Sequence, residues 1–277
     1  MSFGVFAAVL AAALVHAGWN VLVKGAADKL AMTVSVALGA AVVSASILPF
    51  LPLPAPESWP FLGASVLLQT VYYLLIPRAY RIADMSLAYP LMRGAAPLVV
   101  ALSGAMVFGE TLRNGQWMAI GLISAGIGAL ALGAFRQPLG AAGGVTALCN
   151  AMVIAAYTLV DASGVRLSGA PVAYALLLAV LTGVVTLAVV FAGRARPRLD
   201  GRTLALGLVG GAATTLSYGV ALWAMTRAPV APVAALRETS IIFALVLSRL
   251  AFGEKVGGRR IAAALLVMAG VAALRLF

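Results

Sequence analysis

A short motif that could place a positive charge inside a membrane occurs twice in this sequence. Arg93 is followed fifteen residues later by Phe108-Gly109-Glu110, and Arg237 is followed at the same spacing by Phe252-Gly253-Glu254. Both motifs lie in strongly apolar segments, where a charged side chain costs free energy and marks a function or a specific partner. A guanidinium can bind a carboxylate through two parallel hydrogen bonds. We therefore expect either an anion site or a gating ion pair, with Glu238 as the only deep acid that could pair with Arg93.

Other polar and aromatic side chains also occur within apolar segments, where they must find partners or line a polar interior. His16, Trp19 and Asn20 share one helical face by their three- and four-residue spacing. His16 is the only histidine, so it is either a proton-coupling group or a satisfied structural residue. The candidate substrate-cavity residues are His16, Trp19, Asn20, Gln69, Tyr73, Tyr89, Asn150, Tyr157, Ser217 and Tyr218. Such uncharged, aromatic walls suit a ligand with an apolar side chain and one polar end.

The sequence offers few side chains for catalysis or metal binding. It has one histidine and one cysteine, and a lone histidine without neighbouring acids is not a metal site. A Ser217–His16 dyad is the nucleophile–base combination that an intramembrane enzyme would need. We predict no catalytic residue, no metal and no cofactor, and an intramembrane enzyme is the alternative from another class. Cys149 lies in an apolar run, where we expect a small residue of the core.

The composition excludes an ordinary soluble domain. Hydrophobic residues make up 63% of the chain and charged residues 10%, whereas about a quarter of a soluble domain is charged. The net charge of +11 comes from short basic clusters between apolar runs, which is typical of topology signals in membrane proteins. We therefore expect the lipid bilayer, and no nucleic acid, as a partner.

Apolar segments of the length needed to cross a bilayer, about twenty residues, recur along the chain. They lie near 3–23, 31–51, 59–80, 85–107, 115–134, 142–162, 171–192, 203–225, 230–251 and 259–276. Short loops rich in proline or basic residues separate them. The sequence thus predicts an all-α integral membrane protein with ten transmembrane helices and no separate soluble domain.

The basic residues of the loops predict the orientation. The loops after the odd-numbered spans hold Lys24, Lys29, Arg78, Arg81, Arg136, Arg194, Arg196, Arg198, Arg202, Arg249, Lys255, Arg259 and Arg260. The loops after the even-numbered spans, together with the C-terminus, hold Arg113, Arg166, Arg227 and Arg275. Because loops rich in Lys and Arg stay in the cytoplasm, both termini are predicted on the outer, periplasmic side.

The two halves of the chain are related. An offset of 138 residues aligns the first span with the sixth, and an offset of 144 residues aligns the fourth span and its motif with the ninth. Five spans per half is an odd number, so the second half must cross the membrane inverted. We therefore expect an N-terminal repeat at 1–136 and an inverted C-terminal repeat at 137–277, around a central cavity. The two arginines are then expected at different depths, one nearer each side.

The ten spans and the Gly-Glu turn after the fourth helix of each half resemble the EamA-type carriers of the drug/metabolite transporter superfamily. Ala228-Pro-Val-Ala-Pro232 and its counterpart Ser86-Leu-Ala-Tyr-Pro90 fit the same pattern. Within the superfamily the chain is most similar to bacterial amino-acid exporters, including the aromatic amino-acid group. The resemblance implies a cavity formed mainly by helices 1, 3, 4, 6, 8 and 9, with helices 5 and 10 to the side. It also implies a secondary transporter of the bacterial inner membrane that exports small amphipathic metabolites, amino acids above all, by alternating access.

A multidrug exporter for cationic compounds is the alternative within the same class. The related small drug-resistance proteins carry a glutamate in the middle of helix 1, where this chain has His16 and no acid, and this departure disfavours the alternative. The expected partners are a small-molecule substrate and a proton as a candidate coupling ion. Gly121, Ala125, Ala129 and Gly133 form a small-residue stripe in the fifth span. Such a stripe permits packing within a monomer or the seam of a weak homodimer.

Overall fold

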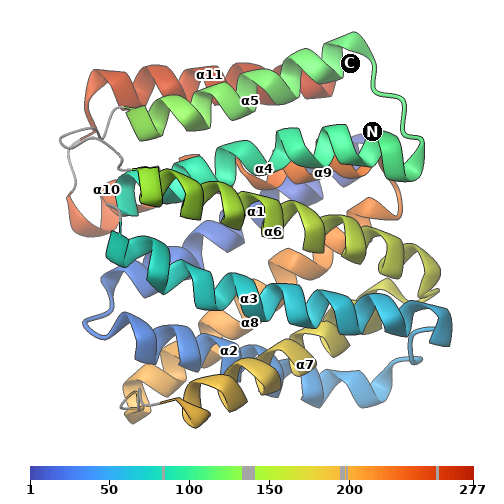
Figure 1. Ribbon diagram of the computed structural model, residues 1–277, viewed down its shortest axis with the longest axis vertical. Helices are drawn as coiled ribbons and strands as arrows, with labels where there is room; N and C mark the ends of the chain where they lie inside the picture. The colour runs from blue at the N-terminus through green and yellow to red at the C-terminus, as the bar shows by residue number, and fades with distance from the viewer. Residues whose placement is uncertain (83–84, 133–140, 194–196, 198, 254–255) are drawn as a thin grey trace.

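The computed structural model of the chain describes residues 1–82, 85–132, 141–193, 197, 199–253 and 256–277 (Figure 1). Within these ranges, the side chains of residues 73–74, 76–91, 131–132 and 141–143 lie outside the description. Every regular element of the described chain is a helix. The prediction of an all-α fold is therefore confirmed.

The helices follow one another in two series of five spans. The first series comprises α1 (Phe3–Gly25), α2 (Lys29–Ile47), the short turns η1 (Leu48–Phe50) and η2 (Pro56–Ser58), α3 (Trp59–Ile82), α4 (Met85–Phe108) and α5 (Asn114–Leu132). The second comprises α6 (Ala141–Leu167), α7 (Pro171–Ala192), α8 (Gly201–Met225), α9 (Val230–Arg237), α10 (Ser240–Phe252) and α11 (Gly258–Leu276). Of the spans in the described chain, six are long and apolar enough to cross a membrane by length and composition.

Several helices begin where a side chain can accept the first free N–H groups. Asp28 accepts a hydrogen bond from the Ala31 N–H at 2.9 Å, and Asp200 accepts one from the Thr203 N–H at 2.7 Å. An acidic side chain at this position satisfies an orphan donor and interacts favourably with the helix dipole. The starts of α2 and α8 are therefore set by residues just outside the apolar segments.

The ninth span, predicted near 230–251, is found at Val230–Phe252 and is broken near its middle. The helix α9 ends at Arg237, and α10 begins at Ser240. The Glu238 N–H donates to the Ala235 carbonyl at 3.2 Å, and the Thr239 N–H donates to the Leu236 carbonyl at 3.1 Å. These bonds span three residues instead of four, as in a 3₁₀ turn. The break therefore tightens the backbone without leaving these two N–H groups unpaired.

The spans are arranged in layers (Figure 1). The helices α5 and α11 lie side by side at one end of the molecule, whereas α2 and α7 lie at the opposite end. The helices α1, α3, α4, α6, α8 and α9 occupy the space between these pairs. The fifth and tenth spans are thus to the side, and the layer between them and the α2–α7 pair contains the polar residues described below.

Two seams of small residues hold this arrangement together. On the first, α2 and α8 approach so closely that a Cβ added to Gly211 would lie 2.2 Å from the Ala40 nitrogen. On the second, between α5 and α11, a Cβ added to Gly126 would lie 2.6 Å from a methyl group of Val267. Backbones can pack at such distances only where the side chain is absent.

The α5 seam differs from the predicted stripe. A Cβ on Gly121 would have no neighbour within 4 Å, and Ala125 is exposed, while Gly133 lies outside the described residues. The close contact with α11 is instead made by a different face of α5. On this face Gly126 packs against Val267, and the backbone of Ala119 packs against Gly270. Small residues occur on both faces of α5, so their spacing alone did not identify the packed one.

The repeated Phe-Gly-Glu motif has a conformational explanation. Gly109 and Gly253 have positive φ angles of 62° and 66°. A residue with a side chain adopts this left-handed conformation at a cost, and helices commonly end on a glycine in it. The two glycines therefore end the fourth and ninth spans in the same manner, which accounts for their recurrence at equal spacing.

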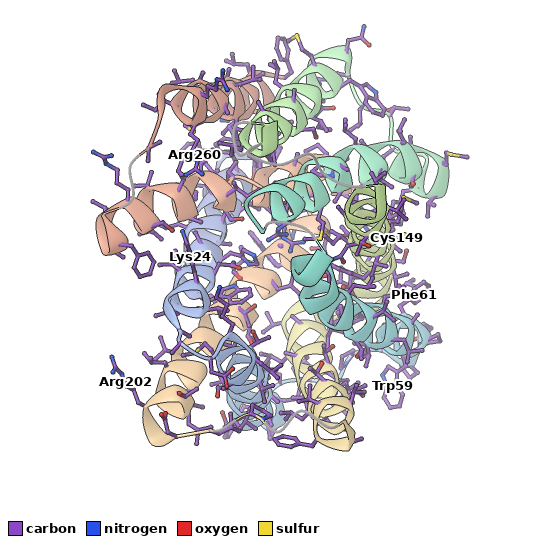
Figure 2. All side chains as sticks on the ribbon, turned by 60° about the vertical axis from the view of Figure 1, so that its left-hand side comes forward. Lys24, Trp59, Phe61, Cys149, Arg202 and Arg260 are labelled. Carbon is purple, nitrogen blue, oxygen red and sulfur yellow. The ribbon has the colours of Figure 1, made fainter. Side chains whose placement is uncertain are left out.

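Cys149 is exposed on α6 (Figure 2), which corrects the expectation of a residue in the core. The apolar run around it led to that expectation. In a membrane protein, however, the outer face of a helix is as apolar as its interior, because lipid chains solvate it. An apolar run therefore does not separate core positions from outward-facing ones.

Candidate functional site

A small polar cavity lies among α1, α4, α8 and α9. Its lining residues are Ala12, Ala13, His16, Arg93, Ser217 and Arg237, and the space between them, partly open to the outside, has room for little more than one water molecule. The two alanines leave room beside α1, while the other four side chains supply polar atoms. The cavity thus combines groups from both repeats, because α1 and α4 belong to the first and α8 and α9 to the second.

Arg93 and Glu238 form a buried ion pair across the two repeats. The Arg93 Nη1 donates to the Glu238 Oε1 at 3.1 Å, and the two side chains are 4% and 5% exposed. Glu238 lies at the break between α9 and α10. Its second oxygen, Oε2, is buried without a hydrogen-bond partner among the described atoms. The ion pair neutralises the charge of Arg93 and joins α4 to the broken span.

His16 lies between two donors. The Arg93 Nη2 is 2.6 Å from the His16 Nε2, and the Trp19 indole Nε1 donates to the His16 Nδ1 at 3.2 Å. Guanidinium and indole groups can only donate, whereas a neutral imidazole has a single acceptor nitrogen. The two contacts therefore compete for one acceptor. Asn20 donates to the backbone carbonyl of His16 at 2.8 Å, so its amide binds its own helix.

Arg237 has a different environment from its counterpart Arg93. Its guanidinium carbon lies 4.7 Å from the centre of the Tyr218 ring, a distance typical of a cation–π contact. Arg237 is half-buried, and no carboxylate of the described chain forms an ion pair with it. Its positive charge is consequently not neutralised by an acid in the way that the charge of Arg93 is.

Both arginines line one cavity, and the expectation that they lie at different depths, one nearer each side, stays a prediction. Each arginine lies eight or nine residues into its span, which is about 12 Å at the rise of an α-helix. In a hydrocarbon core about 30 Å thick, both positions fall close to the midplane. Any remaining difference in depth between the two backbone positions is within the reach of an arginine side chain.

Asp161 is a buried acid that the sequence analysis missed. It lies on α6 with no exposed surface. The Tyr174 hydroxyl donates to its Oδ1 at 3.2 Å, the Gln69 amide donates to its Oδ2 at 3.2 Å, and the Tyr218 hydroxyl also donates to Oδ2. Its position near the end of the predicted 142–162 segment concealed its depth. The helix α6 extends to Leu167, which places Asp161 a turn and a half inside.

The remaining predicted cavity residues have varied surroundings. Tyr157 is buried between the rings of Tyr72 and Tyr218, with centroid separations of 5.9 and 6.3 Å. Asn150 is fully buried and its amide donates to the Met92 sulfur at 2.9 Å. The side chains of Tyr73 and Tyr89 lie outside the described residues. A direct contact between any of these residues and a substrate stays a prediction.

A second charged cluster joins the two repeats at the end of the molecule where α4 ends and α9 begins. Arg166 binds the Glu110 Oε1 at 2.7 Å and the Met225 carbonyl at 2.9 Å. The Glu110 Oε2 accepts a hydrogen bond from the Val230 N–H, the first residue of α9, at 2.9 Å. The acid of the first Phe-Gly-Glu motif therefore caps a helix of the other repeat. At the opposite end, Lys24 donates to Ser248 of α10 at 3.3 Å.

The fold and the cavity together define a class of protein. Ten helical spans in two repeats, with a polar cavity and a cross-repeat ion pair between them, are the architecture of a multi-pass membrane transporter. Among the described residues, no group of three or more His, Cys, Asp or Glu side chains could hold a metal ion.

Comparison with known proteins gives the family. The sequence profile of the EamA-like transporter family matches residues 2–132 and again residues 141–276, so the chain belongs to this family and contains its domain twice. One solved structure, named only "Crystal structure of protein", is similar with a TM-score of 0.79 at 20% identity. The match covers 99% of this chain and 98% of the other, and at this identity it shows the fold alone. No curated protein matches the sequence.

Proposed function

We propose that this transporter exports small amphipathic metabolites, and amino acids in particular, across the bacterial inner membrane by alternating access. The observation that carries the proposal is that the two arginines of one cavity have different partners. Arg93 is paired with Glu238, while Arg237 stacks on an aromatic ring and forms no ion pair with an acid of the described chain. The cavity therefore offers one guanidinium that a substrate carboxylate can bind.

The surroundings of Arg237 suit such a ligand. A charge-assisted hydrogen bond between a guanidinium and a carboxylate contributes about 1.5–3 kcal/mol. The Tyr218 ring lies against Arg237 and the Tyr157 ring packs against Tyr218, so aromatic surface for an apolar side chain lies next to the cavity. An amino acid presents both features, a carboxylate and a side chain, within a small volume. In this conformation the cavity has room for little more than one water molecule, so binding an amino acid requires the two repeats to move apart.

The charges of the cavity disfavour the export of organic cations. Two of the residues that line it in the described chain are arginines, and none is an acid. Glu238 is committed to Arg93, and Asp161 is surrounded by hydroxyl and amide donors. A cationic substrate would meet Arg237 without a compensating carboxylate, which is unfavourable at low dielectric constant.

Alternating access would move the two repeats against each other. We propose that α4 and α9 are the moving walls, because each carries one arginine and because Glu238 links them through Arg93. The proposed direction, from the cytoplasm outward with both termini outside, rests on the distribution of basic residues among the loops.

Uptake into proteoliposomes tests the proposal. Labelled amino acids should accumulate, and Arg237→Gln should raise the KM about tenfold or more, since about 1.4 kcal/mol of lost binding free energy corresponds to one decade. The matched control is Arg227→Gln. Arg227 also stacks on an aromatic ring, that of Trp223 at 5.7 Å, but does not line the cavity. If no amino acid accumulates, or if both variants change the KM equally, the proposed substrate class is wrong.

The same assay tests a proton as the coupling ion. Uptake is measured with and without an imposed pH gradient, in the wild type and in His16→Gln. Coupling through His16 requires a dependence on the gradient that this substitution removes. Because both neighbours of His16 are donors in this conformation, taking up a proton would require Arg93 to move away. Transport that ignores the gradient excludes His16 as a proton carrier.

A further inference from the structure

We propose that Asp161 is a positioning residue for substrate binding, which holds Tyr218 so that the Tyr218 ring supports the guanidinium of Arg237 at the cavity wall. The inference rests on the proposed function, in which Arg237 binds a substrate carboxylate. Asp161 itself does not line the cavity. It acts through one intermediate side chain, Tyr218, that contacts both groups.

The first step is the fixed position of the Asp161 carboxylate. It accepts hydrogen bonds from side chains on three other helices: Tyr174 on α7, Gln69 on α3 and Tyr218 on α8. The Gln69 amide also donates to the Ser65 hydroxyl at 3.1 Å. A buried carboxylate with donors on both oxygens is held strongly, because releasing any donor leaves a buried charge less satisfied. Asp161 is therefore a rigid point among α3, α6, α7 and α8.

The second step is the connection from Asp161 to Arg237 through one phenol. The Tyr218 hydroxyl donates to Asp161, while the face of the same ring lies 4.7 Å from the guanidinium carbon of Arg237. The hydrogen bond fixes the far end of the side chain, so the ring cannot turn to another rotamer without losing it. Donation to a carboxylate also increases the electron density of the ring, which strengthens its attraction for a cation.

The third step is the consequence for the charge of Arg237. Tyr218 contacts a guanidinium with its ring face and a carboxylate of opposite charge with its hydroxyl. If the ring moved away, the flexible arginine side chain could turn toward Asp161 and form an ion pair with it. Arg237 would then be neutralised in the same way as Arg93. The position of Tyr218 therefore keeps one positive charge available at the cavity.

Two matched substitutions test this connection. Tyr218→Phe removes the hydroxyl on Asp161 but keeps a ring beneath Arg237. Tyr174→Phe removes the other hydroxyl on the same carboxylate, and no arginine of the described chain stacks on the Tyr174 ring. Both variants lose one buried hydrogen bond to Asp161, so a merely structural role predicts similar effects. We expect the KM for amino-acid uptake to rise several-fold, roughly three- to tenfold, in Tyr218→Phe and to stay near the wild-type value in Tyr174→Phe.

A second readout follows Arg237 without transport. Phenylglyoxal reacts with accessible guanidinium groups, and mass spectrometry of the peptide that contains Arg237 gives its rate of modification. This rate should change several-fold in Tyr218→Phe and remain unchanged in Tyr174→Phe. Asp161→Asn, which replaces one acceptor oxygen by a donor, should raise the KM as Tyr218→Phe does, but it leaves no carboxylate at this position with which Arg237 could pair, so Arg237 should stay reactive toward phenylglyoxal.

The outcomes separate this inference from the proposed function. An unchanged rate of Arg237 modification in Tyr218→Phe overturns the positioning role, and so do equal changes in the two tyrosine variants. If the modification rate changes as expected while Arg237→Gln leaves the KM for every amino acid unaltered, Asp161 does position Arg237 but the carboxylate site is wrong. If both readouts change in Tyr218→Phe alone, the positioning role and the substrate site are both supported.

Discussion

The buried pair of Arg93 and Glu238 should be essential for stability, and replacing only one partner should be the more damaging change. Their N···O distance is 3.1 Å, which corresponds to about 5 kcal/mol of attraction at an effective dielectric constant of about 20. The cost of removing both charges from water offsets much of this attraction. A single substitution loses the attraction and retains the cost of burying the remaining charge.

We therefore expect Glu238→Gln and Arg93→Gln each to lower the free energy of unfolding by about 3–5 kcal/mol, the range for breaking a buried ion pair. At about 2–4 °C per kcal/mol, this corresponds to a decrease in Tm of roughly 6–20 °C. The double substitution removes both charges, so its effect should be smaller than the sum of the two single effects. The difference measures the interaction between the two side chains.

Thermal unfolding of the purified protein in one detergent provides the assay, with the variants and wild type measured side by side. Arg202→Gln is the control, because Arg202 is exposed near the start of α8 (Figure 2) and a surface substitution should change stability by no more than about 0.5 kcal/mol. A Tm of Glu238→Gln that equals the wild-type value would refute the reasoning. Strict additivity in the double variant would show that the two side chains do not interact energetically.

Three further predictions concern other parts of the fold. Glu110→Gln keeps an acceptor for the first N–H of α9 and should cost less than about 1 kcal/mol, whereas Glu110→Ala loses this cap and should cost about 1–2 kcal/mol in the same unfolding assay. Gly211→Ala should destabilise by about 1–3 kcal/mol because its new methyl group meets backbone, while Gly121→Ala, with open space, should not. The hydrogen bond from the Thr203 backbone lowers the pKa of Asp200 below 3.8. The stabilisation of α8 by the Asp200 carboxylate should therefore be complete above pH 3.8 and be lost as the pH falls through the lowered pKa. In Asp200→Ala, the decrease of Tm over this acidic range should become smaller.

The span pattern and the repeat could be predicted from sequence because the bilayer imposes them. A segment must supply about twenty apolar residues to cross, so the ends of α1, α4 and α7 fall within two residues of the predicted limits. The pairing of Arg93 with Glu238 was one of the alternatives considered, and it followed from charge alone. A deep cation in an apolar chain needs an anion, and few acids are available.

The details of the site could not be predicted in the same way. Asp161 was overlooked because hydropathy shows where a span lies but not how far its helix continues beyond the bilayer core. The shared cavity of Arg93 and Arg237 depends on the reach of their side chains, which a count of residues along a helix does not include. The exposure of Cys149 depends on the direction in which α6 faces, and an apolar residue is equally acceptable toward lipid and toward protein.

The break between α9 and α10 has a consequence for how the molecule moves. A short 3₁₀ segment within a helix is a common hinge, and the backbone bonds across Glu238 and Thr239 are already of this kind. The two pieces of the ninth span can therefore tilt separately without exposing unpaired N–H groups to lipid. Its counterpart α4 is a single helix from Met85 to Phe108 and must move as one rod. Although the two repeats are related in sequence, opening one side of the cavity is therefore mechanically different from opening the other.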